Sequence, residues 1–261
     1  MMFAAAAVTV RDVTVQPPLD PEAFCAAFAP VVDRLRLGLA HAMRERTMSS
    51  EALVPPGISE PGMATITMLR NTYPARAVAL SGLRDVFTYL PEPVVETGIR
   101  ELFDADLVDE PDAGQVRLTA RGRELIVAFQ SLSGATVSDL WGSERADMEL
   151  LLALADRAVT AAGETGGPAF AVVAPPYDPP DASAAAKLAE RLTALRFHRF
   201  DAHMAAWRAA GMTVDEMPAL PEGDRRQAIE ADTNRRDAAP YTHLTQDERL
   251  ELLAGLSALP S

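Results

Sequence analysis

The stretch Leu188–Trp207 constrains the fold most, because apolar residues recur through it at helical spacing. On a helix with about 3.6 residues per turn, one broad arc carries the large apolar side chains Leu188, Leu192, Leu195, Phe200, Met204 and Trp207. Arg196, Arg199 and His203 fall inside this arc, whereas His198 and Asp201 fall on the other side. An unpaired buried charge is costly, so the first three residues need an anionic partner from protein or ligand. We expect His198 and Asp201 to face solvent or a partner segment.

Two interpretations of the arc follow. In the functional one, Arg196 and Arg199 hold an anionic or polar ligand, His203 is a catalytic group that titrates near neutrality, and Trp207 is part of the apolar wall. If later segments pack there, the polar side chains facing this ligand site would be Asp232, Thr233, Asn234 and Tyr241. In the structural one, the arginines pair with carboxylates at a helix–helix interface and His203 is a core histidine.

The sequence shows no motif for metal binding, nucleophilic catalysis or phosphate binding. His198, Asp201 and His203 do not form a metal site on one helix, because His203 lies well round the helix from the other two. No nucleophile elbow, phosphate-binding glycine loop or zinc signature occurs, so no metal is predicted and no cofactor or reaction is named. Cys25, the single cysteine, falls on an apolar helix face and is interpreted as packing.

Composition narrows the possible partners. The 261-residue chain is 48% hydrophobic, as expected for a globular protein, and carries a formal charge of −13 that repels phosphate backbones unless basic residues are segregated. A single cysteine excludes an internal disulfide, the opening residues lack the basic region of a secretory signal, and no apolar run is long enough for a membrane span. We therefore expect a cytoplasmic protein without a membrane partner.

Residues 83–123 carry a recognisable order of elements. Short helices are predicted at Leu83–Tyr89 and Pro93–Leu107, followed by a hairpin turned at Pro111–Gly114 and by L-T-A-R-G-R, in which Thr119 caps a further helix. This order resembles the winged helix-turn-helix of MarR-type regulators, in which the L-T-x-x-G-R step after the wing is characteristic. The resemblance implies that Pro93–Leu107 is the recognition helix, that Glu110–Val116 is the wing, and that the long helix predicted at Asp20–Arg46 supports a homodimer.

The charge on these surfaces opposes DNA binding. Residues 85–112 contain a single basic residue, Arg100. The acidic residues of the same stretch are Asp85, Glu92, Glu96, Glu101, Asp104, Asp106, Asp109, Glu110 and Asp112. The helix start P-E-P-V-V-E-T offers no side chain suited to phosphate or to a base edge, and the wing tip is Pro-Asp-Ala-Gly. Arg117, Arg121 and Arg123 follow the wing and would restore only part of the affinity.

A second resemblance covers roughly Asp147–Leu256. Its motifs are R-F-H-R-F-D-A-H-M-A-A-W, then I-E-A-D-T-N-R-R-D-A-A-P-Y, then L-T-Q-D-E-R-L. They resemble the C-terminal part of an actinobacterial helix-turn-helix family that includes SalK-like proteins. Asn234 and the charged R-R-D before Ala238 depart from the family pattern. The family's regulatory label comes from its fold, so the resemblance implies little chemistry.

Four short segments complete the predicted structure. Val8–Val15 and Phe170–Val173 have the pattern of short extended segments, and the helix that begins near Arg123 is expected to be interrupted at Ser133-Gly134. The prolines of residues 175–180 predict a stiff connection that could line a pocket mouth.

Together these patterns predict a mainly α fold. It comprises an N-terminal arm and helix (residues 1–64), a winged helix-turn-helix domain (65–138) and a C-terminal helical domain (139–261). The predicted function is a winged-helix protein repurposed to bind, and possibly to transform, a small molecule of specialised metabolism, with its pocket at Arg196, Arg199 and His203. The alternative is a ligand-responsive MarR-type transcriptional regulator that binds DNA. Whether the chain is an enzyme is left open.

Overall fold

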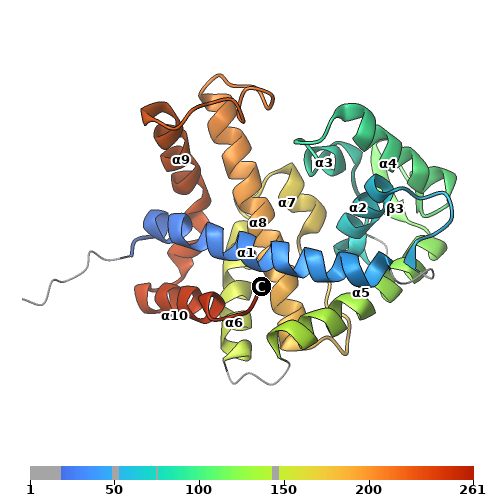
Figure 1. The fold of residues 1–261 in the computed structure, drawn as a ribbon, viewed down its shortest axis with the longest axis horizontal. Helices are drawn as coiled ribbons and strands as arrows, with labels where there is room; N and C mark the ends of the chain where they lie inside the picture. Colours follow the sequence, from blue (N-terminus) through green and yellow to red (C-terminus); the bar gives the residue numbers. More distant parts are fainter. Residues whose placement is uncertain (1–18, 49–52, 75, 143–146) are drawn as a thin grey trace, which may run out of the picture.

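The computed structural model describes residues 19–48, 53–74, 76–142 and 147–261, and these are mainly helical with one small antiparallel sheet (Figure 1). The strand predicted at Val8–Val15 lies outside the described residues. The described α-helices are α1 (Pro21–Met48), α2 (Glu60–Met68), α3 (Leu80–Asp85), α4 (Glu92–Asp104), α5 (Ala120–Trp141), α6 (Met148–Ala162), α7 (Pro168–Val173), α8 (Ala184–Ala209), α9 (Asp224–Asp237) and α10 (Gln246–Ser257). Two short 3-10 helices, η2 (Leu69–Thr72) and η3 (Ala239–His243), join them.

Helix α1 is part of the chain's own core. It begins where the Asp20 carboxylate accepts a hydrogen bond from the Ala23 amide at 2.8 Å, close to the predicted start. Its apolar face packs against α5, α8, α9 and α10, and buries Phe24, Phe28, Val32, Leu35 and Leu39. The face that carries these side chains therefore belongs to the core of the described chain.

Residues 60–118 form α2, η2, strand β1 (Val78–Ala79), α3, α4 and the strands β2 (Val108–Asp109) and β3 (Gln115–Leu118). The sheet order is β1-β3-β2, with Val78 opposite Val116 and Val108 opposite Leu118. The helix predicted at Pro93–Leu107 ends earlier, because Asp106 takes a left-handed conformation with φ 56°. The hairpin lies where the sequence predicts it.

The glycine of the L-T-A-R-G-R step has a packing reason. Thr119 is the N-cap of α5 and accepts a hydrogen bond from the Gly122 amide at 3.1 Å. A Cβ at Gly122 would lie 2.0 Å from the Leu107 carbonyl oxygen, so a side chain there would push α5 away from the end of α4.

The helix predicted at Leu83–Tyr89 is instead α3, which begins at Leu80 and ends at Asp85. Two other short-range predictions were also wrong. Helix α5 runs without interruption through Ser133-Gly134, because packing against α1 and α8 outweighs a glycine penalty of about 1 kcal/mol. Phe170–Val173 is helical as part of α7, because Pro168 begins the helix and the Asp201 carboxylate accepts the amides of Ala169 and Phe170.

One main core cluster runs from Phe24 to Leu259, so the segments 1–64, 65–138 and 139–261 all contribute to the same interior. A second cluster lies where the C-terminal end of α8 meets α9 and contains Met204, Ala206, Trp207, Met212, Met217 and Ile229. Helix α8 crosses the middle of the molecule and packs against α1, α5, α6, α7 and α9 (Figure 1). Among the described helices none is long and apolar enough to cross a membrane.

Candidate functional site

Helix α8 divides its polar residues between two faces. Ser183 caps the helix by accepting a hydrogen bond from the Ala186 amide at 3.2 Å, and Gly211, with φ 71°, follows its end, as the sequence predicts. His198, Asp201, Ala205 and Arg208 recur three or four residues apart and line an open cleft. Arg196 and Arg199 point instead toward acidic side chains of α1 and α9.

A chain of hydrogen bonds joins α8 to α9 and to the loop after α6. The Thr165 hydroxyl lies 2.9 Å from Nε2 of His198, and Nδ1 of His198 lies 2.8 Å from Oδ1 of Asp237. Oδ2 of Asp237 accepts a hydrogen bond from Nη1 of Arg199 at 3.3 Å. The same nitrogen donates to Oδ1 of Asn234 at 2.9 Å. Asp237 is thus the acceptor shared by two cationic or titratable groups of α8.

Burial differs along this chain. The side chains of His198 and Asp237 are each 2% exposed, and Arg199 is 21% exposed. Thr165 is exposed at the rim of the cleft. Solvent therefore reaches the hydroxyl end of the chain, whereas the imidazole and the carboxylate are shielded.

The end of α9 explains why Asp237 points inward. Asp237 is the last residue of α9, and η3 follows with Pro240 and Tyr241. Tyr241 is 1% exposed, and its ring packs on Phe24 and Phe28 of α1 with centroid distances of 4.9 and 5.4 Å. This anchor fixes the turn after α9, so that Asp237 faces α8 while its neighbour Arg236 faces the cleft.

The loop Thr165–Pro168 is held against α8 by close contacts. A Cβ at Gly167 would lie 2.6 Å from Cγ of Asp201, and one at Gly166 would lie 2.2 Å from the Phe170 ring. Oδ2 of Asp201 accepts the Phe170 amide at 2.8 Å, and Oδ1 accepts the Ala169 amide at 3.2 Å. Burial still raises the pKa of Asp201 above its ordinary value, against the lowering effect of these amides.

Helix α8 also carries a separate His203 branch beside the second core cluster. Nε1 of Trp207 donates to Nε2 of His203 at 2.7 Å, and the Thr233 hydroxyl lies 3.4 Å from Nδ1. Oε1 of Glu230 lies 3.7 Å from Nδ1. Burial lowers the pKa of His203, and Arg199 and Arg226 act in the same direction, against the raising effect of Glu230.

The predicted site residues therefore separate into groups. Arg199, Asn234 and Tyr241 come together around Asp237, and His203 contacts Trp207. Arg196 lines the same small cavity as Arg199, Asp237 and Tyr241, but it is 45% exposed and pairs with Asp33 of α1 at 2.8 Å. Asp232 does not face this cluster, because it pairs with Arg235 and Arg236 of its own helix. The arginines of the apolar arc thus find their anionic partners within the protein.

Of the two surroundings predicted for His198 and Asp201, solvent or a partner segment, the structure shows the second. Neither faces plain solvent, because His198 is held by Thr165 and Asp237 and Asp201 is held by the start of α7. Thr165 and Asp237 carried no sequence signal, since they lie 33 and 39 residues from His198.

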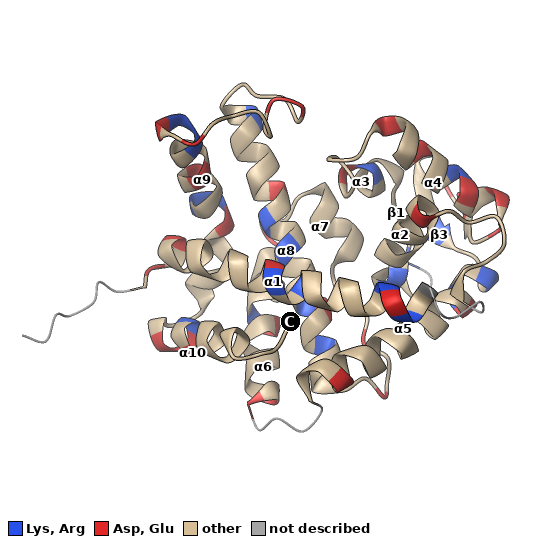
Figure 2. Ribbon diagram, in the orientation of Figure 1, with Lys and Arg blue, Asp and Glu red and all other residues tan. Residues whose placement is uncertain are grey.

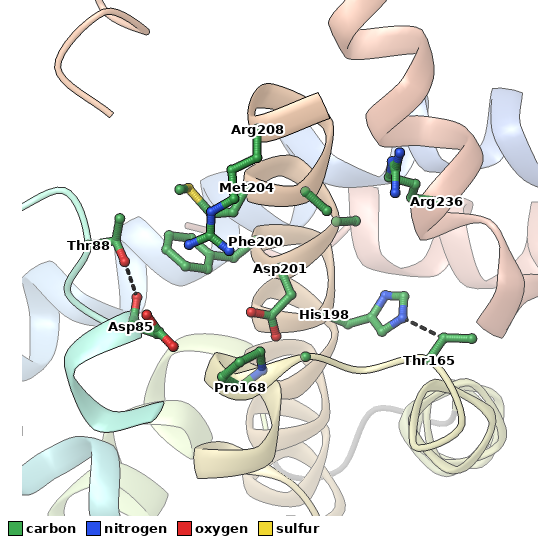
Figure 3. A pocket seen from close by; sticks show the side chains of 13 residues that line it. Asp85, Thr88, Thr165, Pro168, His198, Phe200, Asp201, Met204, Arg208 and Arg236 are labelled. Atoms are coloured by element: carbon green, nitrogen blue, oxygen red, sulfur yellow. Dashed lines mark hydrogen bonds between the residues drawn. The ribbon is translucent and has the colours of Figure 1, made fainter. Parts of the chain in front are cut away.

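The cleft has a volume of about 370 Å³. Figure 3 shows α8 between two walls, with Asp85 and Thr88 on one side and Thr165 and Arg236 on the other. Phe200, Met204 and Pro168 supply apolar surface, and Arg208 extends over Phe200. Arg208 forms no salt bridge or side-chain hydrogen bond with any residue in the described ranges.

Cys25 is not positioned as a nucleophile. It is buried in α1, and burial, with a further effect of the Asp237 carboxylate, raises the pKa of its thiol far above the ordinary range. Tyr241 is not positioned as a nucleophile either, because its burial and the nearby Asp237 raise the pKa of its phenol. The Thr165 hydroxyl is therefore the nucleophilic group that the network presents to the cleft.

Comparison of the chain with protein-family models, with curated proteins and with solved structures gives no match. The function is accordingly argued from the geometry of the site.

The lowered pKa of His203 predicts a pH-dependent stability. A histidine whose pKa is lower in the folded than in the unfolded chain stabilises the fold above the unfolded value of 6.5, and this contribution is lost as the pH falls below it. Protonation also removes the acceptor that Trp207 uses. We expect acidification from about pH 7.5 to about pH 5.5 to lower the melting temperature more in the wild type than in His203→Gln. Equal losses in thermal melts of the two proteins would contradict this assignment.

Proposed function

We propose that this chain is a winged-helix protein that binds a small molecule in the α8 cleft. The observation that carries the proposal is the cleft itself, which combines the apolar side chains of Phe200 and Met204 with the unpaired guanidinium of Arg208. Its volume suits a small ligand, since ligand pockets usually begin near 300 Å³.

The winged helix is supported by the order of elements. Helices α2, α3 and α4 precede the β2–β3 hairpin, and β1 pairs with β3 at the edge of the same small sheet. In this proposal α4 is the recognition helix and the turn between β2 and β3 is the wing. We also propose that the chain is related to MarR-type regulators and to the SalK-like family, and that it is cytoplasmic.

The charges of this region favour a function other than DNA binding. Helices α3 and α4 carry more acidic than basic residues (Figure 2). Arg84 beside α4 is held by Glu96 at 2.6 Å, and Arg117 of the hairpin is held by Asp109 at 2.9 Å. Because phosphate contacts require cations that are not already paired, Arg84 and Arg117 are poorly placed for DNA.

The lining of the cleft indicates the ligand's chemistry. Arg208 and Arg236 place cations at its rim, and Arg236 also pairs with Asp232 at 3.1 Å. Arginine binds carboxylates and phosphates with two parallel hydrogen bonds, and Phe200 and Met204 offer contact to an apolar group. We therefore propose a small ligand with an apolar part and an acidic group.

A homodimer, which the MarR resemblance implies, would need a surface other than the buried face of α1. Leu37 of α1 is 67% exposed and lies outside that face.

Titration with 8-anilinonaphthalene-1-sulfonate tests the cleft, because this dye combines aromatic rings with an anionic group. Ala205→Phe places a ring in the cleft floor, and Ala209→Phe makes the same change on α8 outside the cleft. We expect Ala205→Phe to weaken dye binding by about tenfold or more, equivalent to about 1.4 kcal/mol, and Ala209→Phe to leave it unchanged.

The charge requirement is tested with the same dye. Arg208→Ala should weaken binding several-fold, whereas Arg121→Ala, which makes the same change at an exposed position outside the cleft, should not. Equal affinities in the Ala205→Phe, Ala209→Phe and wild-type proteins would place the dye elsewhere and overturn the proposed binding site.

The second candidate is the MarR-type regulator, which the order of α3, α4 and the hairpin favours. A mobility-shift titration at low salt with the DNA upstream of the chain's own gene decides between the two functions. Tight, sequence-specific binding would support the regulator, and no shift would exclude it.

A further inference from the structure

We infer that Thr165, His198 and Asp237 form a catalytic nucleophile–base–acid relay that cleaves a small ester bound in the α8 cleft. This inference rests on the proposed small-molecule function and adds a reaction and a substrate class to it. In it Thr165 is the nucleophile, His198 is the general base and Asp237 is the residue that positions His198.

The order of the three groups is that of a nucleophilic relay. The hydroxyl-to-Nε2 distance of 2.9 Å and the Nδ1-to-carboxylate distance of 2.8 Å both lie within hydrogen-bond range. A carboxylate only accepts hydrogen bonds, so Nδ1 of His198 carries the proton in the neutral imidazole and Nε2 is free to accept the proton of Thr165. The relay thus has its tautomer set by Asp237.

The exposure of the three groups fits the same role. A nucleophile must reach the substrate, and Thr165 is the exposed member of the relay at the cleft rim. His198 and Asp237, each 2% exposed, lie behind it and are shielded from water that would weaken their interaction. Figure 3 shows the His198 ring directed from α8 toward Thr165.

A purely structural role for the Thr165–His198 bond is less well supported. The loop that carries Thr165 is already fixed by the hydrogen bonds that the α7 amides donate to Asp201 and by the close packing of Gly166 and Gly167. Asp237 is likewise held by Arg199, which in turn is held by Asn234. The loop does not need a buried imidazole to hold it in place.

The reaction balances with water as the second reactant. Oγ of Thr165 attacks the ester carbonyl carbon as its proton passes to Nε2 of His198, and Asp237 stabilises the resulting imidazolium. The bond from the carbonyl carbon to the alcohol oxygen breaks, and His198 returns the proton to the departing alkoxide. Water then attacks the carbonyl carbon of the acyl-threonine and gives up a proton to His198. The bond from this carbon to Oγ of Thr165 breaks, His198 returns the proton to Oγ, and a carboxylic acid is released.

The position of Arg236 indicates which ester fits. Arg236 immediately precedes Asp237 on α9 and lines the cleft on the same side as Thr165. A cation at this place favours an acyl group that ends in a carboxylate, while Phe200 and Met204 accept an apolar alcohol part. The substrate class is therefore a small ester with an acidic acyl group.

The test uses 4-nitrophenyl hydrogen glutarate as substrate and a fluorophosphonate as a covalent probe, with intact-protein and peptide mass spectrometry. Thr165→Val removes the hydroxyl and keeps the size of the side chain, and Thr160→Val makes the same change at an exposed position of α6 outside the cleft. We expect Thr165→Val to lose at least about 100-fold in kcat/KM and to lose the probe adduct. Thr160→Val keeps both, and Thr165→Ser restores the hydrolysis and labelling that Thr165→Val lacks.

The outcomes separate the relay from the binding site. Three results would each overturn the relay. They are equal hydrolysis by the wild type and Thr165→Val, no hydrolysis by the wild type, and a probe adduct on another residue. If Ala205→Phe still weakens dye binding in that case, the proposed binding function stands without the reaction. If Thr165-dependent hydrolysis occurs while Ala205→Phe changes neither dye binding nor KM, the reaction stands and the cleft is wrong.

Discussion

Replacing Asp237 with alanine is expected to destabilise the protein by about 3–5 kcal/mol, the usual cost of removing one partner of a buried ion pair. The reason is that Asp237 is 2% exposed and accepts hydrogen bonds from both His198 and Arg199. Without it, a guanidinium that is 21% exposed and a buried imidazole both lose their acceptor.

Urea unfolding followed by far-ultraviolet circular dichroism measures this loss. Asp232→Ala is the matched control, because it removes the same residue type from the same helix but breaks only pairs with Arg235 and Arg236 at the helix surface. Such pairs contribute about 0.3–0.5 kcal/mol each, so the control should stay within about 1 kcal/mol of the wild type. Similar losses in the two variants would mean that Asp237 is not the centre of the α8–α9 interface.

Replacing Trp207 with alanine is expected to cost about 3–5 kcal/mol, the range for truncating a large buried aromatic side chain. Trp207 is 1% exposed and is the largest member of the cluster formed with Met204, Met212, Met217 and Ile229. The change also removes the donor to His203. The loss should fall on the end of α8 and its contact with α9.

The fluorescence of Trp141 remains available in this variant and reports on α5, while circular dichroism reports on all helices. Leu250→Ala is the control, since Leu250 is 44% exposed and its truncation should cost well under 1 kcal/mol. Trp207→Phe should lose less than Trp207→Ala because it retains most of the apolar contact. A Trp207→Ala protein as stable as the Leu250→Ala protein would contradict the packing described for the second cluster.

Much of the fold was predictable from local pattern. The helical spacing of Phe24, Phe28, Val32, Leu35 and Leu39 predicted α1, and these side chains are buried. Thr119 caps α5, as the sequence predicts, and Ser183 and Thr245 cap α8 and α10 in the same way. Periodicity failed for α7, whose six residues are too few to show a helical repeat.

The candidate site was predictable only in part. Periodicity placed Arg199 and His203 of α8 among apolar neighbours, and the resemblance to the SalK-like family directed attention to Asn234 and Tyr241. Periodicity left open whether His198 and Asp201 face solvent or a partner segment, and in the structure that side of α8 is covered by α7 and by the loop before it. A helix wheel shows which residues share a face and contains no information on which segment covers that face.

Local periods and caps encode helices because they depend on side chains within one or two turns of each other. The alignment of Thr165, His198 and Asp237 depends instead on three segments that are 33 and 39 residues apart. It follows from Tyr241 anchoring the end of α9 on α1, from Gly166 and Gly167 letting the loop approach α8, and from Asp201 starting α7. Contacts of this range come from the packing of whole helices, so only the folded chain brings the hydroxyl, the imidazole and the carboxylate into line.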